Sequence, residues 1–186
     1  MMRDRPGVRG HFYLEARNRH GDLIEVVDEK NVILDVGLVS MARTMDVSAT
    51  TARTFFGLQV GDNGALSTNP AIPKTIDAAT QTELYHELGG VATRTAAGFT
   101  AVQQGAPNDN QVLCQQSFDS SSYATTDFAD ITKMYMNEAM CFISNAAEST
   151  SIWSPFAMRT FKSVPFAPTD AITVLIKWTF IFEKAS

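Results

Sequence analysis

The chain has 186 residues, a length that suits one domain, and 45% of them are apolar, enough to build a core and to exclude a wholly disordered protein. The net charge is −5, but residues 1–20 hold five arginines against two carboxylates and carry +3, which leaves −8 on the remainder. The longest apolar run is interrupted by Lys177 and is shorter than the roughly 20 residues that span a bilayer, so we expect no transmembrane segment.

Residues 1–10 are predicted to form a flexible basic arm that precedes a single domain over residues 11–186. Proline and glycine oppose regular structure in the arm, and its arginines would be costly to bury without partners. We expect Arg3, Arg5 and Arg9 to contact acidic groups on neighbouring subunits, the alternative being a tail without a partner. Sparse aromatic residues disfavour nucleic acid as the partner. No apolar segment typical of secretion follows the arginines, so synthesis and assembly in the cytoplasm are expected.

The first third of the chain favours a hairpin, a helix and a strand, in that order. Residues 11–18 and 23–27 alternate loosely on either side of a turn-forming Asn-Arg-His-Gly sequence, which predicts a β-hairpin. The apolar spacing in residues 32–45 favours a helix over its second half, with Asp35 as a candidate cap. Residues 55–64 are predicted to form a strand that ends in the tight turn Gly-Asp-Asn-Gly.

Two further segments precede the second half of the chain. Residues 65–77 contain two prolines among Ser, Thr and Asn, and we expect an exposed excursion without regular structure. Residues 80–88 contain helix formers and two leucines one helical turn apart, and two glycines follow, so a short helix is predicted.

The second half of the chain predicts strands separated by clusters of Gly, Pro, Asn, Asp and Ser. In the last strand every second residue from Ile172 to Phe182 is apolar, so Trp178 and Phe180 are expected to lie in the core. The fold class that we predict is mainly β: an antiparallel β-sandwich, jelly-roll-like, with one or two short helices. The predicted strands span residues 91–103, 111–118, 131–144, 156–163 and 172–182.

Five segments in this order resemble virion structural proteins of tailed bacteriophages. In the first half they are KNVILDVGLVSMARTM, FFGLQVGDNG and AATQTELYHEL. In the second half they are KMYMNEAMCFISN, in which Asn137-Glu138 precedes an apolar strand, and PFAMRTFKSVPFAPTDAITVLIKWTFIF, which ends in the strand that carries Trp178.

The resemblance implies a non-enzymatic protein of the virion, assembled in the bacterial host cytoplasm, whose partners are the major capsid protein or other virion subunits. A capsid cement or decoration protein is the leading interpretation. The alternative is a collar, tail-fibre or tail-tip protein, which could contact glycans on the host surface. A homotrimer is expected, because such proteins meet symmetric sites on the particle.

No catalytic residue, cofactor or metal site is predicted. The three histidines, His11, His20 and His86, are scattered, and no nucleotide-binding or nucleophile motif is present. Asp127 and Asp130 are interpreted as part of a solvated loop. A glycan hydrolase, the third hypothesis, would need a facing carboxylate pair that the sequence does not indicate.

Aromatic and sulfur-containing side chains are interpreted mainly as core. Trp153 and the phenylalanines that follow it could line a sugar-binding groove, but core packing is the favoured interpretation. The methionines of residues 134–140 are assigned to a buried face rather than to a soft-metal site. Cys114 and Cys141 are predicted to be buried free thiols.

Overall fold

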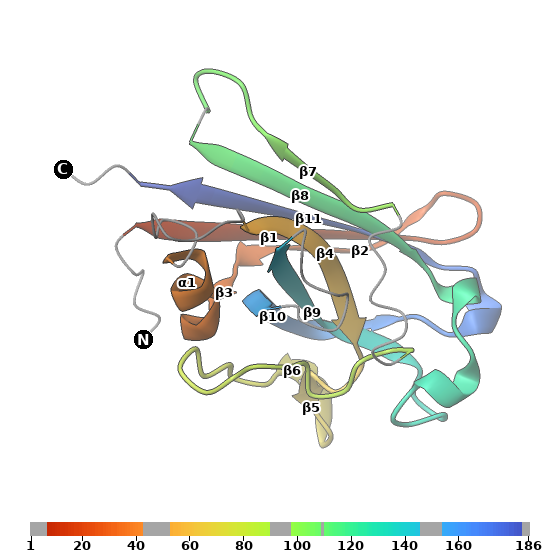
Figure 1. Cartoon of the computed structure of the whole chain (residues 1–186). Helices are drawn as coiled ribbons and strands as arrows, with labels where there is room; N and C mark the ends of the chain where they lie inside the picture. Colours follow the sequence, from red (N-terminus) through yellow and green to blue (C-terminus); the bar gives the residue numbers. More distant parts are fainter. Residues whose placement is uncertain (1–6, 43–52, 90–97, 109, 146–153, 184–186) are drawn as a thin grey trace.

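Two large antiparallel sheets dominate the computed structural model, which describes residues 7–42, 53–89, 98–108, 110–145 and 154–183 (Figure 1). The described part of the chain is mainly β and contains one α-helix, as the sequence predicts. None of the described helices is long and apolar enough to cross a membrane.

The five-stranded sheet contains both ends of the described chain, because the first strand pairs along its whole length with the last. Its outermost strands are β2 on one side and β7 on the other. In spatial order the strands are β2 (Leu23–Lys30), β1 (Val8–Arg17), β11 (Thr173–Phe182), β8 (Gln111–Asp119) and β7 (Thr100–Gln103).

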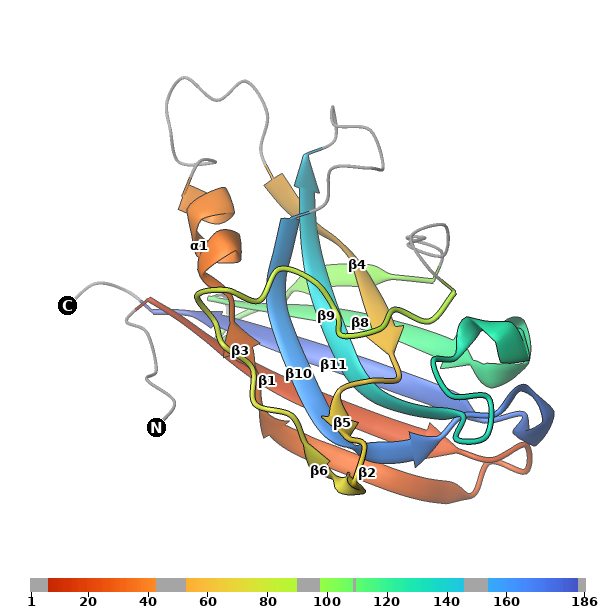
Figure 2. The ribbon, with the colours of Figure 1, turned by 90° about the horizontal axis from the view of Figure 1, so that it is seen from below.

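The four-stranded sheet lies across the first one, and its strands cross those of the larger sheet at a steep angle (Figure 2). In spatial order its strands are β3 (Val32–Ile33), β10 (Ser154–Pro165), β9 (Tyr135–Asn145) and β4 (Arg53–Gly61). The remaining elements are the helix α1 (Asp35–Ala42), the two-stranded sheet of β5 (Ala65–Leu66) and β6 (Asn69–Pro73), and 3-10 turns at Ser120–Ser122, Thr125–Asp127 and Pro168–Asp170.

The main core lies between the two large sheets. Phe12 of β1 stacks on Phe161 of β10 with ring centroids 5.5 Å apart, and Phe180 of β11 stacks on Phe55 of β4 at 4.7 Å. Alternate residues of β11 are buried, as the period of two in the sequence predicts, and both Trp178 and Phe180 are fully buried. Aromatic rings from both sheets therefore join them into one core.

A second, smaller apolar cluster covers the other side of the four-stranded sheet. Met140, Phe142 and Met158 pack there against Leu34, at the start of α1, and against Leu84. The helix lies very close to β10, since a Cβ atom on Gly37 would be 2.5 Å from the Phe156 Cα atom. Only glycine fits at this position without moving the strand.

The hairpin predicted at the start of the chain is present, and so are a helix over Asp35–Ala42 and a strand that ends in the Gly61–Gly64 turn. The hairpin turn is held by Asn18, whose Oδ1 accepts from the backbone amides of His20 and Asp22 at 2.8 and 3.0 Å. This is the local hydrogen bonding that makes Asn common in turns.

The short helix predicted over residues 80–88 is wrong. This segment consists of turns and bends, with one bridge from Glu87 to Gly61. Its backbone bonds to β4 instead of to itself: the Leu88 amide donates to the Val60 carbonyl at 3.0 Å, and the Asp62 amide donates to the His86 carbonyl at 3.1 Å. The segment thus covers the free edge of β4, and tertiary pairing overrides its local helix propensity.

Two predicted boundaries also differ. The excursion over residues 65–77 contains the small β5–β6 hairpin, in which all of β6 is exposed. Strand β1 begins at Val8, three residues before the predicted start of the domain at residue 11, because Val8 to Gly10 pair with the end of β11. Residues 1–6 of the predicted arm lie outside the described residues.

Candidate functional site

A buried carboxylate of β9 organises a network of hydrogen bonds in the described part of the chain. Glu138 is fully buried, and its carboxylate accepts three backbone hydrogen bonds. The amides of Asn63 and His86 donate to Oε1 at 3.1 and 2.9 Å, and the Tyr85 amide donates to Oε2 at 2.8 Å. One side chain therefore fastens two loops to the four-stranded sheet.

The neighbouring residue Asn137 fastens the same turn from the other side of the strand. Its Oδ1 accepts from the Gly64 amide at 2.6 Å, and its Nδ2 donates to the Asp62 carbonyl and to the Ser163 hydroxyl, both at 3.1 Å. The turn packs so closely that a Cβ atom on Gly64 would be 2.5 Å from the Asn137 carbonyl oxygen. The glycine at this position is a steric requirement.

Asp62 extends the network to a third loop. Its side chain is 1% exposed, its Oδ2 accepts from the Ala129 amide at 2.7 Å, and its Oδ1 lies 2.6 Å from His86 Nδ1. We call Asp62, His86, Asn137 and Glu138 the polar cluster. Its hydrogen bonds join β4, β9 and the loops around residues 86 and 129, so its first role is to hold these segments in place.

Burial sets the protonation chemistry of the two acids in the polar cluster. Desolvation raises the pKa of Glu138 above its ordinary value of 4.5, although the three backbone amides oppose this shift. Desolvation likewise raises the pKa of Asp62, against the lowering effects of the Ala129 amide and of His86. Both carboxyl groups hold a proton more tightly in the folded chain than in the unfolded one.

A pH dependence follows from the raised pKa of Glu138. The folded state is favoured below the ordinary value of 4.5, and this advantage is lost as the pH rises through the raised pKa. In the variant Glu138→Gln the side chain cannot ionise, so we expect wild type to lose stability relative to this variant as the pH rises above 4.5. Urea unfolding of both proteins at several pH values measures this difference.

Asp130 provides a control of opposite sign, because hydrogen bonds from Thr132 lower its pKa. Relative to Asp130→Asn, wild type should gain stability as the pH rises through the acid range. If the difference in unfolding free energy between wild type and Glu138→Gln stays constant with pH, the pKa of Glu138 is not raised.

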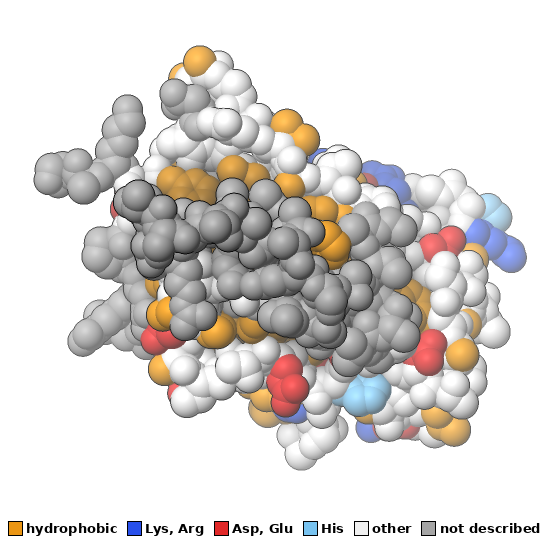
Figure 3. Space-filling view, in the orientation of Figure 1, with side chains coloured by type: hydrophobic (Ala, Val, Ile, Leu, Met, Phe, Trp, Pro, Cys, Tyr) orange, Lys and Arg blue, Asp and Glu red, His pale blue; other side chains and the backbone are white. Residues whose placement is uncertain are grey.

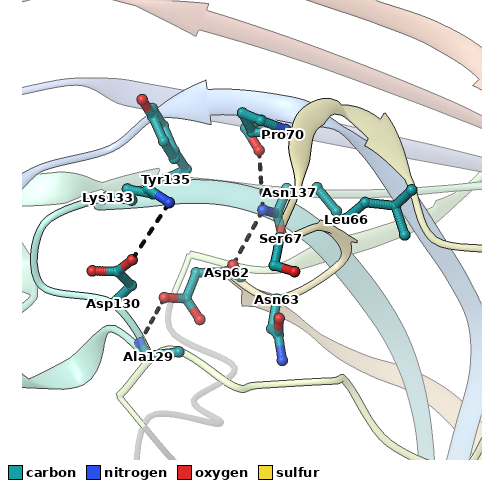
Figure 4. Close-up of a pocket in the computed structure, with 12 residues that line it drawn as sticks. Asp62, Asn63, Leu66, Ser67, Pro70, Ala129, Asp130, Lys133, Tyr135 and Asn137 are labelled. Carbon is teal, nitrogen blue, oxygen red and sulfur yellow. Dashed lines mark hydrogen bonds and ion pairs between the residues drawn. The ribbon is translucent and has the colours of Figure 1, made fainter.

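A pocket of about 270 Å³ opens beside the polar cluster (Figure 4). Asp62 and Asn137 form part of its wall, and the loop from Ala129 to Lys133 and the β5–β6 hairpin enclose it. Lys133 Nζ lies 3.9 Å from Asp130 Oδ2 at the rim, and both side chains are about half exposed. The pocket thus offers an ammonium, an amide and the Tyr135 side chain to a small polar ligand.

The chemistry of this pocket favours binding over acid-base work. The carboxylates of Asp62 and Glu138 are already occupied by backbone amides of the chain. Among the described residues there is no group of three His, Cys, Asp or Glu side chains that could hold a metal ion. Asp127 and Asp130, considered above as a pair, each accept hydrogen bonds from their own loop, at Ala124 and at Thr132.

A second candidate surface is the outer strand of the larger sheet. β2 carries three exposed apolar side chains: Leu23 is 54% exposed, Ile24 38% and Val26 39%. Figure 3 shows apolar side chains at several places on one face of the molecule, some of them beside charged ones. On β2 three exposed apolar side chains lie within four residues of one strand, at the edge of a sheet.

The three carboxylates of β2 have partners within the described chain. Lys162 Nζ lies 3.1 Å from the Glu25 carboxylate, Arg159 pairs with Glu29, and His11 Nε2 lies 2.7 Å from the Asp28 carboxylate. Charged side chains commonly protect edge strands from pairing with another chain. On β2 these charges are engaged, while the apolar side chains remain exposed.

The residues singled out in the sequence are distributed over different parts of the molecule. Arg9 lies in β1 and pairs with Glu183 of the same chain, so its ion pair is internal. Arg3, Arg5 and Trp153 lie outside the described residues. Phe156, Phe161 and Phe166 are buried, in agreement with the core interpretation and not with a sugar-binding groove.

The sequence analysis did not identify the polar cluster, although it noted both Asn137-Glu138 and the Gly61–Gly64 turn. The available signal was a glutamate followed by six apolar or small residues in a predicted strand. A charged residue in such a run must either face solvent or find buried partners, and buried charges are rarely left unpaired. What the sequence did not reveal was that the partners are backbone amides of distant loops.

Comparisons of the chain with protein-family models, with curated proteins and with solved structures find no match.

Proposed function

We propose that this chain is a non-enzymatic structural protein of a tailed-bacteriophage virion, and that it binds neighbouring capsid subunits as a cement or decoration protein. It is assembled in the cytoplasm of the bacterial host and acts on the particle as a homotrimer. The resemblance of its sequence segments suggests the particle, and the exposed apolar edge of β2 supports a role in subunit contact.

We infer that the two large sheets form a β-sandwich, since aromatic rings from both pack into one core. A jelly-roll-like connection is supported by the pairing of β1 with β11 and of β3 with β10, which brings early and late strands together in both sheets. The hairpin of β9 and β10 within one sheet departs from that pattern, because successive jelly-roll strands usually alternate between sheets. A rigid sandwich suits a protein that supports surface contacts.

The observation that carries this proposal is the open edge of β2. In the part of the chain that the structure describes, no strand pairs with the outer edge of β2, so a partner strand could bond there while covering Leu23, Ile24 and Val26. Exposed apolar groups of this kind commonly mark interaction sites. The arginines Arg3 and Arg5 would add charged contacts to acidic groups on the same neighbour, contacts that weaken as salt rises.

Electron microscopy of intact particles that contain the chain tests the proposed location. A cement or decoration protein forms an array on the capsid lattice. A single ring at one vertex would contradict the cement assignment and support the collar or tail alternative.

The substitution Val26→Lys tests the proposed interface. Val26 lies opposite Glu15 of β1, so a lysine can pair there in the free chain and the urea midpoint should hardly change. At a buried interface the new charge should weaken particle binding by roughly tenfold or more, which corresponds to about 1.4 kcal/mol. Occupancy on purified particles, measured against protein concentration, gives this value.

The matched control is Val102→Lys on β7, the outer strand at the opposite edge of the same sheet, where the side chain is 55% exposed. It should leave particle binding unchanged. If Val102→Lys weakens binding and Val26→Lys does not, the interface lies at β7 and the assignment to β2 is wrong.

The pocket beside the polar cluster favours a second candidate function, a collar, tail-fibre or tail-tip protein that contacts host surface glycans. Lys133, Tyr135 and Asn137 offer hydrogen-bonding groups and a ring at one opening, a combination that suits a sugar. Binding of host-derived oligosaccharides to the purified chain, abolished by Tyr135→Ala, would favour this function over cement.

A further inference from the structure

Two fully buried cysteines lie in different sheets of the same core. Cys114 belongs to β8 of the five-stranded sheet and Cys141 to β9 of the four-stranded sheet. Both belong to the apolar cluster between the sheets. This confirms the prediction that they are buried free thiols. Their placement goes beyond that prediction, because the sequence does not show that two cysteines on different strands meet.

The packing of alternate residues along β8 and β9 places both thiols on the core-facing sides of their strands. On β8 the buried positions alternate, at Cys114, Gln116 and Phe118, and on β9 Cys141 shares the core-facing side with Ala139 and Ile143. Packed sheets lie about 10 Å apart, a spacing that a disulfide between facing strands bridges in other β-sandwiches.

A neighbouring hydrogen bond shows how closely the two sheets approach at this point. Leu58 of β4 is the register partner of Cys141, and its backbone amide donates to the side chain of Gln116 at 3.2 Å. Gln116 lies two residues from Cys114 on the same face of β8. The sheets are thus joined directly beside the cysteines.

The thiols also interact with each other. Burial is the main cause that raises the pKa of Cys141 above its ordinary value, and a hydrogen bond with the Cys114 thiol adds to this effect. The thiolate is the nucleophile in disulfide exchange, so the raised pKa makes Cys141 unreactive, and burial keeps oxidants away from both sulfur atoms while the core is closed.

We propose that Cys114 and Cys141 are a disulfide-forming pair that links the two sheets when the chain folds, or transiently opens, in the presence of a small-molecule disulfide such as oxidised glutathione. One cysteine thiolate attacks the oxidant, whose S–S bond breaks to leave a mixed disulfide and one reduced thiol. The second cysteine then attacks the mixed disulfide, the Cys114–Cys141 bond forms, and a second reduced thiol leaves with its proton. The two protein sulfurs are oxidised and the small disulfide is reduced.

The cross-link would tie β8 to β9 and close a loop over residues 115–140, which includes the Ala129 and Lys133 side of the pocket. Closing a loop of this length restricts the unfolded chain and raises stability. The bond would then lie in the closed core, where added reductant reaches it only when the protein opens. This inference is independent of the function proposed above.

The experiment is to refold the purified full-length chain with oxidised and reduced glutathione, and in parallel with reductant alone. After removal of the small thiols and denaturation, thiol titration should find no free thiol in the first sample and two in the second. Peptide mass spectrometry should identify the Cys114 and Cys141 peptides joined to each other. The cross-linked protein should unfold at a clearly higher urea concentration than the reduced one.

The variants Cys114→Ala and Cys141→Ala are the controls. Each should retain one thiol and show the same urea midpoint after refolding in both buffers. Folded wild-type protein that keeps two free thiols after oxidative refolding would overturn the inference, and so would cross-links found only between separate chains. If the alanine variants do not fold, the thiol count and the linked peptide of wild type still decide the question.

Discussion

Replacing Trp178 with alanine is expected to lower the free energy of unfolding by about 3–5 kcal/mol. Trp178 is fully buried in β11, and its ring makes an edge contact with Phe12 at a centroid distance of 5.0 Å. The strand lies between β1 and β8 in the larger sheet, so the cavity left by the indole would have no simple way to collapse. Urea unfolding followed by circular dichroism measures the loss.

The matched variant Trp178→Phe should cost less than half as much. No described residue accepts a hydrogen bond from the buried indole Nε1 atom, so phenylalanine removes volume without breaking such a bond. A wild-type denaturation midpoint in Trp178→Ala would show that this strand is not central to the core.

Removing the carboxylate of Glu138 is expected to have the second large effect. In Glu138→Ala the amides of Asn63, Tyr85 and His86 lose their acceptor inside the protein. Each of these partly buried donors left without a partner costs about 1 kcal/mol, so the free energy of unfolding should fall by about 3 kcal/mol. Part of the loss is offset if water enters beside the pocket.

Glu83→Ala is the control, because Glu83 is exposed and lies in the same segment as two of the three donors. Its effect on the urea midpoint should be within about 0.5 kcal/mol. Hydrogen exchange adds a local measurement: in Glu138→Ala the amides of Tyr85 and His86 should exchange faster than in wild type. Equal stability and equal exchange in the two proteins would show that the carboxylate does not hold the loops.

The exposed edge of β2 shows which part of a candidate interaction surface can be predicted from a sequence. The alternation of residues 23–27 predicted the strand, but it did not indicate which of its apolar side chains stay exposed. Only the strand order places β2 at the edge of the sheet, where Leu23, Ile24 and Val26 remain exposed. Position in the sheet is decided by pairing between residues that are distant in sequence, which a local pattern does not contain.

The sequence by itself determined the features that depend on local physics. The period of two in β11 fixes which side chains face the core, and Asn18 forms its own turn wherever the flanking strands lie. Tertiary structure decided the rest. Residues 80–88 do not form a helix because their amides bond to β4 and to Glu138, and Cys114 and Cys141 share one core only because both large sheets contribute to it. Such contacts join residues dozens of positions apart, so their energy is absent from any local stretch of sequence and appears only when the sheets assemble.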